Sequence, residues 1–217
     1  MNTVNPADFV ADQWPRAKQS LVPTTLKTAY LAVEQMVADE PILQVWSAQD
    51  NRGRLISWAV DLGFQRLIDS GGLPFDYRWV WFSQPTGRYL EIRLPHSIAT
   101  ISQVNDPRKQ PRNVGFRENG RINNQPFFDL PEFEDEQKVT GLPHLLLLHG
   151  HQELSFAHLA VPHPTHHRNF RYRTQNLLHL PHEIETDGPP AENTDTDFEA
   201  LGLLKDDIAK WRRDNDE

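Results

Sequence analysis

Side chains that could do chemistry gather around one predicted β-hairpin. Residues 84–88, Gln-Pro-Thr-Gly-Arg, place proline and glycine where a three-residue hairpin loop uses them. This loop would set Trp81 opposite Glu91. It would also set Trp79 opposite Arg93, and because side chains alternate along a strand, the four would share one face. Such a face could stack a base or a sugar on its indoles, with Glu91 as a general base and Arg93 stabilising negative charge. It could equally be a second packing layer, in which Arg93 covers Trp79 and pairs with Glu91.

The ten histidines all lie between residues 96 and 182 and invite interpretation as a metal site. A type II′ turn predicted at residues 149–152 would separate His149 from His158 by about 20 Å, too far to share an ion. His158 would then be an interior, hydrogen-bonded histidine, or the proton-transfer group of an enzyme. The sequence predicts no complete metal site and names no cofactor, because no Asp, Glu or Cys lies near the remaining cluster of His163, His166 and His167.

Charge divides the chain into two parts. Residues 183–217 hold twelve acidic and four basic side chains, and the resulting charge of −8 equals the net charge of the whole chain. Residues 1–182 are formally neutral, with 18 acidic and 18 basic side chains. Because the ordinary histidine pKa is about 6.5, we expect this body to become cationic in mild acid and to bind the acidic tail more tightly.

The tail itself predicts a linker followed by a helix. Residues 183–196 are acidic and contain glycine and two prolines, which is typical of a linker. Residues 197–217 predict an amphipathic helix that docks on the body or mediates homo-oligomer assembly. Residues 1–182 would then form a single domain. The apolar stripe of the helix consists of Phe198, Leu201, Leu204, Ile208 and Trp211.

Two basic stretches could contact nucleic acid. One, residues 105–121, carries Arg112 and Arg117, and the other, residues 168–173, carries Arg171 and Arg173. If the second stretch is a strand, its arginines face one way and its two aromatic residues the other, which would suit phosphate binding. The alternative is an edge strand whose arginines maintain solubility.

Periodicity and turn signals predict an α+β fold. Helices are expected from Thr24 or Thr25 to residue 40 and over residues 55–69, whereas the prolines at positions 6, 15 and 23 are expected to keep the N-terminus irregular. Asn119-Gly120 is a strong hairpin signal, and residues 97–104 and 145–148 predict a third strand and a buried strand. The sheet would therefore be mainly antiparallel, with N-terminal helices packed on it.

A helix followed by a three-stranded meander and a later buried strand resembles the core of the PD-(D/E)XK nucleases. The resemblance implies a nuclease-like layout, with an acid on the second strand and a Glu-x-Lys or Asp-x-Lys sequence on the third. Here Glu91 and Arg93 lie on the second predicted strand, but residues 97–104 contain neither an acid nor a lysine. We therefore transfer no catalytic role from these nucleases.

These observations leave two classes of function open. The first is a binding or regulatory module that engages nucleic acid or a protein through an arginine- and tryptophan-bearing sheet face. The second is an enzyme that processes a nucleotide or nucleic acid, either nuclease-like or with a histidine-bound metal. Without cysteine, thiolate catalysis and disulfides are excluded. Without an apolar run of about 20 residues or a signal-peptide pattern, we expect a cytoplasmic protein with no membrane partner.

Overall fold

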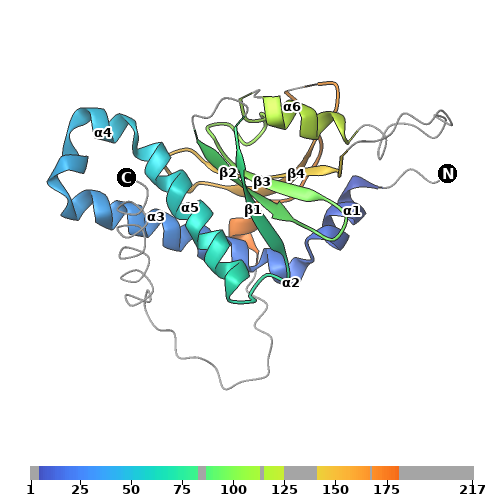
Figure 1. Ribbon diagram of the computed structural model, residues 1–217, viewed down its shortest axis with the longest axis horizontal. Coiled ribbons are helices and arrows are strands. Elements are labelled where there is room, and N and C mark those ends of the chain that lie inside the picture. The colour runs from blue at the N-terminus through green and yellow to red at the C-terminus, as the bar shows by residue number, and fades with distance from the viewer. Residues whose placement is uncertain (1–4, 83–86, 113–114, 125–140, 167, 181–217) are drawn as a thin grey trace, which may run out of the picture.

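The fold is built on one six-stranded sheet whose spatial order equals its chain order (Figure 1). The computed structural model describes residues 5–82, 87–112, 115–124, 141–166 and 168–180. All neighbouring strands are antiparallel except β3 and β4, which run parallel and therefore need a crossover connection. The strands are β1 (Asp76–Trp81), β2 (Arg88–Arg93), β3 (Ile98–Val104), β4 (His144–Gly150), β5 (Ala157–Pro162) and β6 (Phe170–Arg173).

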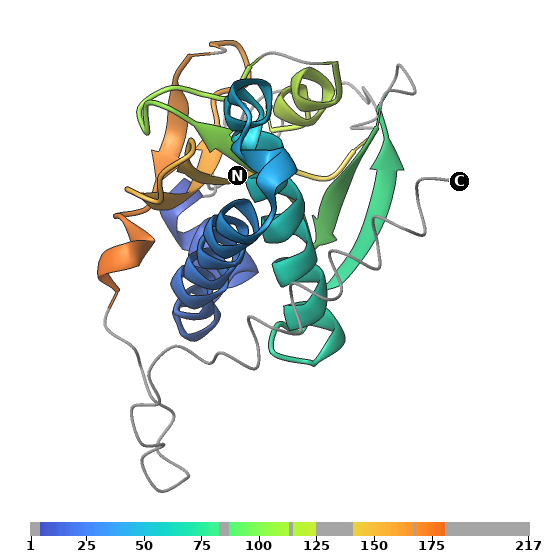
Figure 2. The same cartoon turned by 90° about the vertical axis from the view of Figure 1, so that its left-hand side faces the viewer.

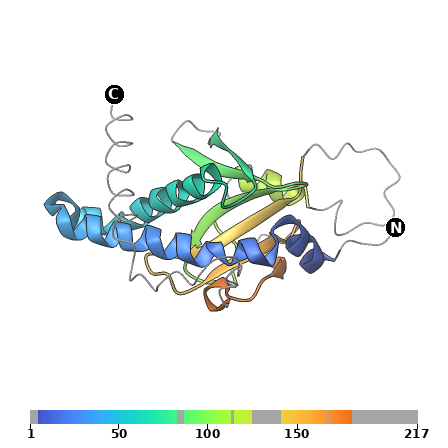
Figure 3. The same ribbon diagram turned by 90° about the horizontal axis from the view of Figure 1, so that it is seen from below.

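Helices lie on both sides of this sheet, as Figures 1 and 3 show. The N-terminal helices and α5 cover one side, and α6 (Gly115–Ile122), between β3 and β4 in the chain, lies on the other. Figure 2 shows α3 and α5 side by side, with the β1–β2 hairpin at the sheet edge. The α+β prediction is confirmed. The other helices are α1 (Pro6–Gln13), α2 (Arg16–Gln19), α3 (Leu21–Asp39), η1 (Pro41–Gln44), α4 (Trp46–Asp50), α5 (Arg52–Asp69) and η2 (Leu177–His179).

We name the two sides of the sheet by what covers them. The helix face packs against α1, α3 and α5 and contains Leu90, Ile92, Ala99, Leu145 and Leu147 of the main core. The crossover face lies beneath α6 and contains Glu91, Thr100, His144, Leu146 and Leu148. The buried strand predicted at residues 145–148 is confirmed as part of β4. Every residue of β4 is buried because the strand is covered on both sides.

The prediction of an irregular N-terminus is wrong because each proline sits where a helix tolerates it. Pro6 follows the N-cap Asn5, whose side chain accepts a hydrogen bond from the Ala7 amide at 3.0 Å. Pro15 is the N-cap of α2, and Pro23 lies in the first turn of α3, which consequently begins before Thr24. In a first turn the amide that proline lacks has no intrahelical partner to lose.

The hairpin predicted at Asn119-Gly120 is also wrong, because both residues belong to α6. Gly120 packs directly on the ring of His144: a Cβ built there would lie 2.7 Å from His144 Nδ1. Glycine at this position therefore permits close contact between helix and sheet, and it does not supply turn geometry. The predicted helix at residues 55–69 is confirmed as α5, which begins three residues earlier.

The predicted linker at residues 183–196 and the predicted tail helix at residues 197–217 lie outside the described residues. Within the described residues, no helix combines the length and the apolar character that crossing a membrane requires.

Candidate ligand-binding site

The β1–β2 register differs from the predicted one and separates the two tryptophans from Glu91. Trp81 pairs with Arg88, and Arg78 takes the place opposite Glu91 that was predicted for Trp81. This shift of three residues is odd, so it moves every β1 side chain to the other side of the sheet. The cause is loop length: pairing begins at Trp81 and Arg88, which leaves a connection longer than the predicted three residues.

The third strand predicted at residues 97–104 is present as β3, which pairs with β2. Thr100 lies opposite Glu91 on the crossover face, and Ala99 lies opposite Ile92 on the helix face. Glu91 and Arg93 therefore share a face, as expected, but their neighbours on β1 are Arg78 and Asp76.

Glu91 is a buried carboxylate that is paired with a half-exposed arginine. Its side chain is 5% exposed, and its Oε1 accepts a hydrogen bond from Arg78 Nε at 2.6 Å; the Arg78 side chain is 53% exposed. This hydrogen bond to Glu91 raises the pKa of Arg78. The buried acid thus fixes the direction of a guanidinium whose outer N–H groups still reach solvent.

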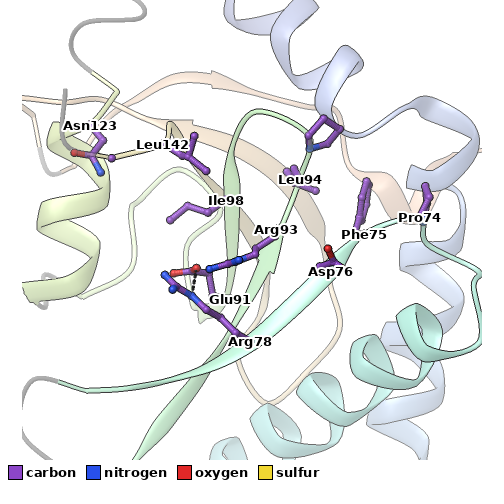
Figure 4. A pocket seen from close by; sticks show the side chains of 12 residues that line it. Pro74, Phe75, Asp76, Arg78, Glu91, Arg93, Leu94, Ile98, Asn123 and Leu142 are labelled. Atoms are coloured by element: carbon purple, nitrogen blue, oxygen red, sulfur yellow. Dashed lines mark hydrogen bonds and ion pairs between the residues drawn. The ribbon is translucent and has the colours of Figure 1, made fainter. Parts of the chain in front are cut away.

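These residues belong to a pocket of about 760 Å³ on the crossover face. Figure 4 shows the charged ends of Arg78, Glu91 and Arg93 gathered on one side of it. Arg93 is exposed and, within the described part of the chain, has no carboxylate oxygen within 4.0 Å. The pocket therefore presents two guanidiniums and two carboxylates: the buried Glu91, which is paired with Arg78, and the exposed Asp76, which lies opposite Arg93 in the ladder without an ion pair to it. Its lining is Pro74, Phe75, Asp76, Arg78, Glu91, Arg93, Leu94, Pro95, Ile98, Asn123, Gly141 and Leu142.

Arg117 of α6 lies close enough to Tyr89 of β2 for its charge to act on the phenol. Burial and the charge of Glu91 raise the pKa of Tyr89, whereas the charges of Arg78 and Arg117 lower it, so this phenol is near both arginines. Arg117 Nη1 donates a hydrogen bond to the carbonyl of Arg112 at 3.1 Å. Burial lowers the pKa of Arg117 to about 10. Arg112 is exposed, so of these two predicted binding residues it is Arg112 that faces solvent.

Trp79 and Trp81 lie on the helix face at the β1 edge, away from this pocket. They are 36% and 56% exposed, and the Arg88 guanidinium lies 4.1 Å from the ring centroid of Trp81. The predicted joint site of these tryptophans with Glu91 and Arg93 does not exist.

His158 is an interior histidine, as predicted, and it lies far from Glu91 and Arg93. Its Nδ1 is 2.9 Å from the Thr174 carbonyl, and it stands on β5, three strands from β2 or about 14 Å across the sheet. The predicted separation of about 20 Å from His149 is wrong, because Leu148 pairs with His158 and His149 with Ala157. The two histidines are close in the ladder, but they point to opposite faces and still cannot share an ion.

The pKa values of His149 and His144 differ from the ordinary histidine value of about 6.5 that the sequence analysis used. Burial lowers the pKa of each to about 3. His149 Nδ1 lies 2.7 Å from the Tyr30 hydroxyl, and His144 Nε2 lies 2.9 Å from Thr100 Oγ1. Mild acid therefore adds fewer than the ten charges expected from the sequence.

Arg171 and Arg173 lie on β6, at the edge of the sheet opposite the pocket. A bulge opposite Val161 and Pro162 interrupts the alternation, so Phe170 and Tyr172 pack on different faces, contrary to the prediction. Arg173 donates a hydrogen bond to the Pro107 carbonyl and so has a structural contact. The structure therefore does not bring this pair together with Arg78 and Arg93.

The residues that the nuclease resemblance requires are not found in the described part of the chain. Helix α5, the β1–β2–β3 meander and the buried strand β4 follow in the expected order, but the helix α6 between β3 and β4 was not expected. However, Thr100 lies opposite Glu91, and no three His, Cys, Asp or Glu residues in the described part of the chain could together hold a metal ion. The arrangement provides guanidinium donors and apolar walls, which suits ligand binding.

Sequence reasoning missed several pocket residues, above all Arg78. The signal that could have found Arg78 is charge pairing. A longer hairpin loop gives the register that sets Arg78 opposite Glu91, and this register joins unlike charges in a cross-strand pair. Comparison of this chain with protein-family models, with curated proteins and with solved structures gave no match.

Proposed function

We propose that this protein is a nucleic-acid-binding module that takes an unstacked nucleotide into the pocket on the crossover face. The observation that carries the proposal is the pair of guanidiniums, Arg78 and Arg93, beside one buried carboxylate, Glu91. Guanidinium groups match the planar geometry of phosphate oxygens, and Arg78 is held in place by Glu91, so little entropy is lost on binding. Arg93 supplies the charge that no carboxylate of the described residues neutralises at contact distance.

The remaining walls suit the base and the sugar. Apolar side chains line much of the pocket, and Asn123 offers both an amide donor and an amide acceptor to a base edge. The volume of about 760 Å³ lies in the range of small-molecule sites, so the pocket accommodates a nucleotide that has left its stack. The apolar lining residues are Phe75, Leu94, Ile98 and Leu142.

An enzymatic role for Glu91 is less well supported. A catalytic base must be within reach of its substrate, but the Glu91 side chain is only 5% exposed and its Oε1 is engaged by a charge-assisted hydrogen bond from Arg78. Binding is thus the function that this geometry favours.

Fluorescence anisotropy with a labelled single-stranded oligonucleotide tests the proposal on the full chain. Arg93→Gln should weaken binding roughly five- to tenfold and should reduce the slope of log affinity against log salt concentration by about 0.7, the value for one phosphate of a single strand. Arg54→Gln is the matched control, because Arg54 is exposed on α5, on the other side of the sheet.

Two results would contradict the proposal. The first is equal oligonucleotide affinity of Arg93→Gln and Arg54→Gln. The second is binding of an acidic peptide but of neither single-stranded nor duplex oligonucleotides, which would indicate a protein partner.

A further inference from the structure

A second, much smaller cavity lies between α6 and the sheet. Its volume is about 10 Å³, which is room for one atom of about the size of a water molecule. It is separate from the nucleotide pocket, with which it shares no lining residue. The lining consists of Gln110, Pro111, Arg117, Arg121, His144, Leu146 and Pro162.

Arg121 lines this cavity and carries buried N–H groups that are unsatisfied within the described residues. The residue is 8% exposed, and within the described residues its Nε and Nη1 have no hydrogen-bond partner. Glu118 Oε1 lies 3.6 Å from Nη2, but the Glu118 side chain is 48% exposed, so water screens its charge. The buried positive charge of Arg121 is therefore only partly compensated.

His144 adds a second unsatisfied group. Its Nε2 lies 2.9 Å from Thr100 Oγ1, and its Nδ1 has no hydrogen-bond partner among the described residues. If the Thr100 hydroxyl donates to Nε2, the ring proton is on Nδ1, and this nitrogen becomes a further donor.

The surroundings hold these donors in place. Asn124, which follows α6, accepts a hydrogen bond from the His144 amide at 2.6 Å and donates to the carbonyls of His144 and Pro162 at 3.0 and 3.3 Å. Gly120 lets the helix approach the His144 ring directly. The cavity is thus a rigid feature of the contact between α6 and the sheet.

An anion satisfies this environment better than water does. A water molecule can accept two hydrogen bonds but adds no charge, so the buried guanidinium would keep Glu118 as its only partial compensation within the described residues. A monatomic anion accepts several hydrogen bonds and also neutralises the charge. A phosphate or sulfate ion needs room for four oxygens, which a cavity of about 10 Å³ does not offer.

We propose that the cavity beneath α6 is a binding site for a halide ion such as chloride, held by Nε and Nη1 of Arg121 and by the Nδ1–H of His144. The site goes beyond the proposed nucleotide binding and does not depend on it. Its role is to neutralise Arg121 and so to stabilise the packing of α6 on β4.

Thermal unfolding of the full chain at constant ionic strength tests this site. A halide site that is half-saturated at ~10 mM raises the unfolding midpoint by about 4–7 °C when ~200 mM gluconate is replaced by chloride or bromide. Arg121→Met should abolish this rise, whereas the control Arg54→Met should retain it. Equal midpoints of the wild type in both salts, or a rise that persists in Arg121→Met, would overturn the proposal.

A crystal grown in bromide gives a second measurement that does not require the variant to fold. The expected result is an anomalous scattering peak at hydrogen-bond distance from Arg121 Nε. Density for water without an anomalous signal at that place would exclude the halide.

Discussion

Buried histidine makes the stability of this protein dependent on pH, and His149 allows the effect to be isolated. Burial lowers the pKa of His149 to about 3 in the folded chain, whereas unfolding restores the ordinary value of about 6.5. Below pH 6.5 the unfolded state therefore binds a proton at His149, whereas the folded state leaves this ring neutral. The stability contributed by the neutral ring is complete above the unfolded pKa and is lost as the pH falls from about 6.5 toward 3.

The magnitude follows from these two pKa values. Between pH 7 and pH 5, linkage predicts that His149 alone removes about 2 kcal/mol from the free energy of unfolding. Burial lowers the pKa of His144 to about 3 as well, so this histidine should remove a similar amount. Asp61 acts in the opposite sense, because burial raises its pKa to about 7, so its protonation in the folded state stabilises the protein as the pH falls.

A variant separates His149 from these other groups. Gln at position 149 does not titrate and can still form a hydrogen bond with the Tyr30 hydroxyl, the partner of His149. Urea unfolding at pH 7 and pH 5 should show that the wild type loses about 2 kcal/mol more than His149→Gln over this interval. His179→Gln is the control, because His179 is exposed.

The outcome that would refute this reasoning is an equal pH dependence of the wild type and His149→Gln. The folded and unfolded states would then have the same affinity for a proton at this position, and the ring would not be held neutral by burial.

Three further changes test the packing of the described residues. Arg78→Gln should lower the free energy of unfolding by about 1–3 kcal/mol in urea titrations, because it leaves Glu91 buried without its ionic partner; the half-exposed position of Arg78 keeps the loss below that of a fully buried pair. Gly120→Ala should destabilise the protein by about 1–3 kcal/mol, despite the better helix propensity of alanine, because the added Cβ would collide with His144; an unchanged melting temperature would contradict the contact. Trp14→Ala should cost about 3–5 kcal/mol by chemical denaturation, because Trp14 is fully buried, and a loss below 1 kcal/mol would place it outside the core.

The sequence predicted elements better than it predicted their alignment. The α+β class, α5, β3 and the buried strand β4 were predictable because their periodicity reflects burial that a single segment can show. The β1–β2 register was not predictable, because it depends on the loop length. An error of an odd number of residues in the register exchanges the two faces of the strand. The same error at the β4–β5 connection misplaced His158, which pairs with Leu148.

The prediction for Asn119-Gly120 failed for a different reason. Its local preference for a turn was overridden by a contact distant in sequence, since Gly120 in α6 packs on His144 in β4. No local pattern shows that a strand 24 residues later requires glycine there. Likewise, the cavity formed by Arg121 and His144 becomes visible only when the crossover helix has been placed on the sheet.

The chemistry of Glu91 follows from its partners more than from its position. The residue opposite Glu91 on β3 is Thr100, so this cross-strand pair brings no second carboxylate to Glu91. Arg78 from β1 supplies the positive charge that a metal ion would otherwise bring. The carboxylate therefore orients a guanidinium toward the pocket, and this is the geometry on which the proposed nucleotide binding rests.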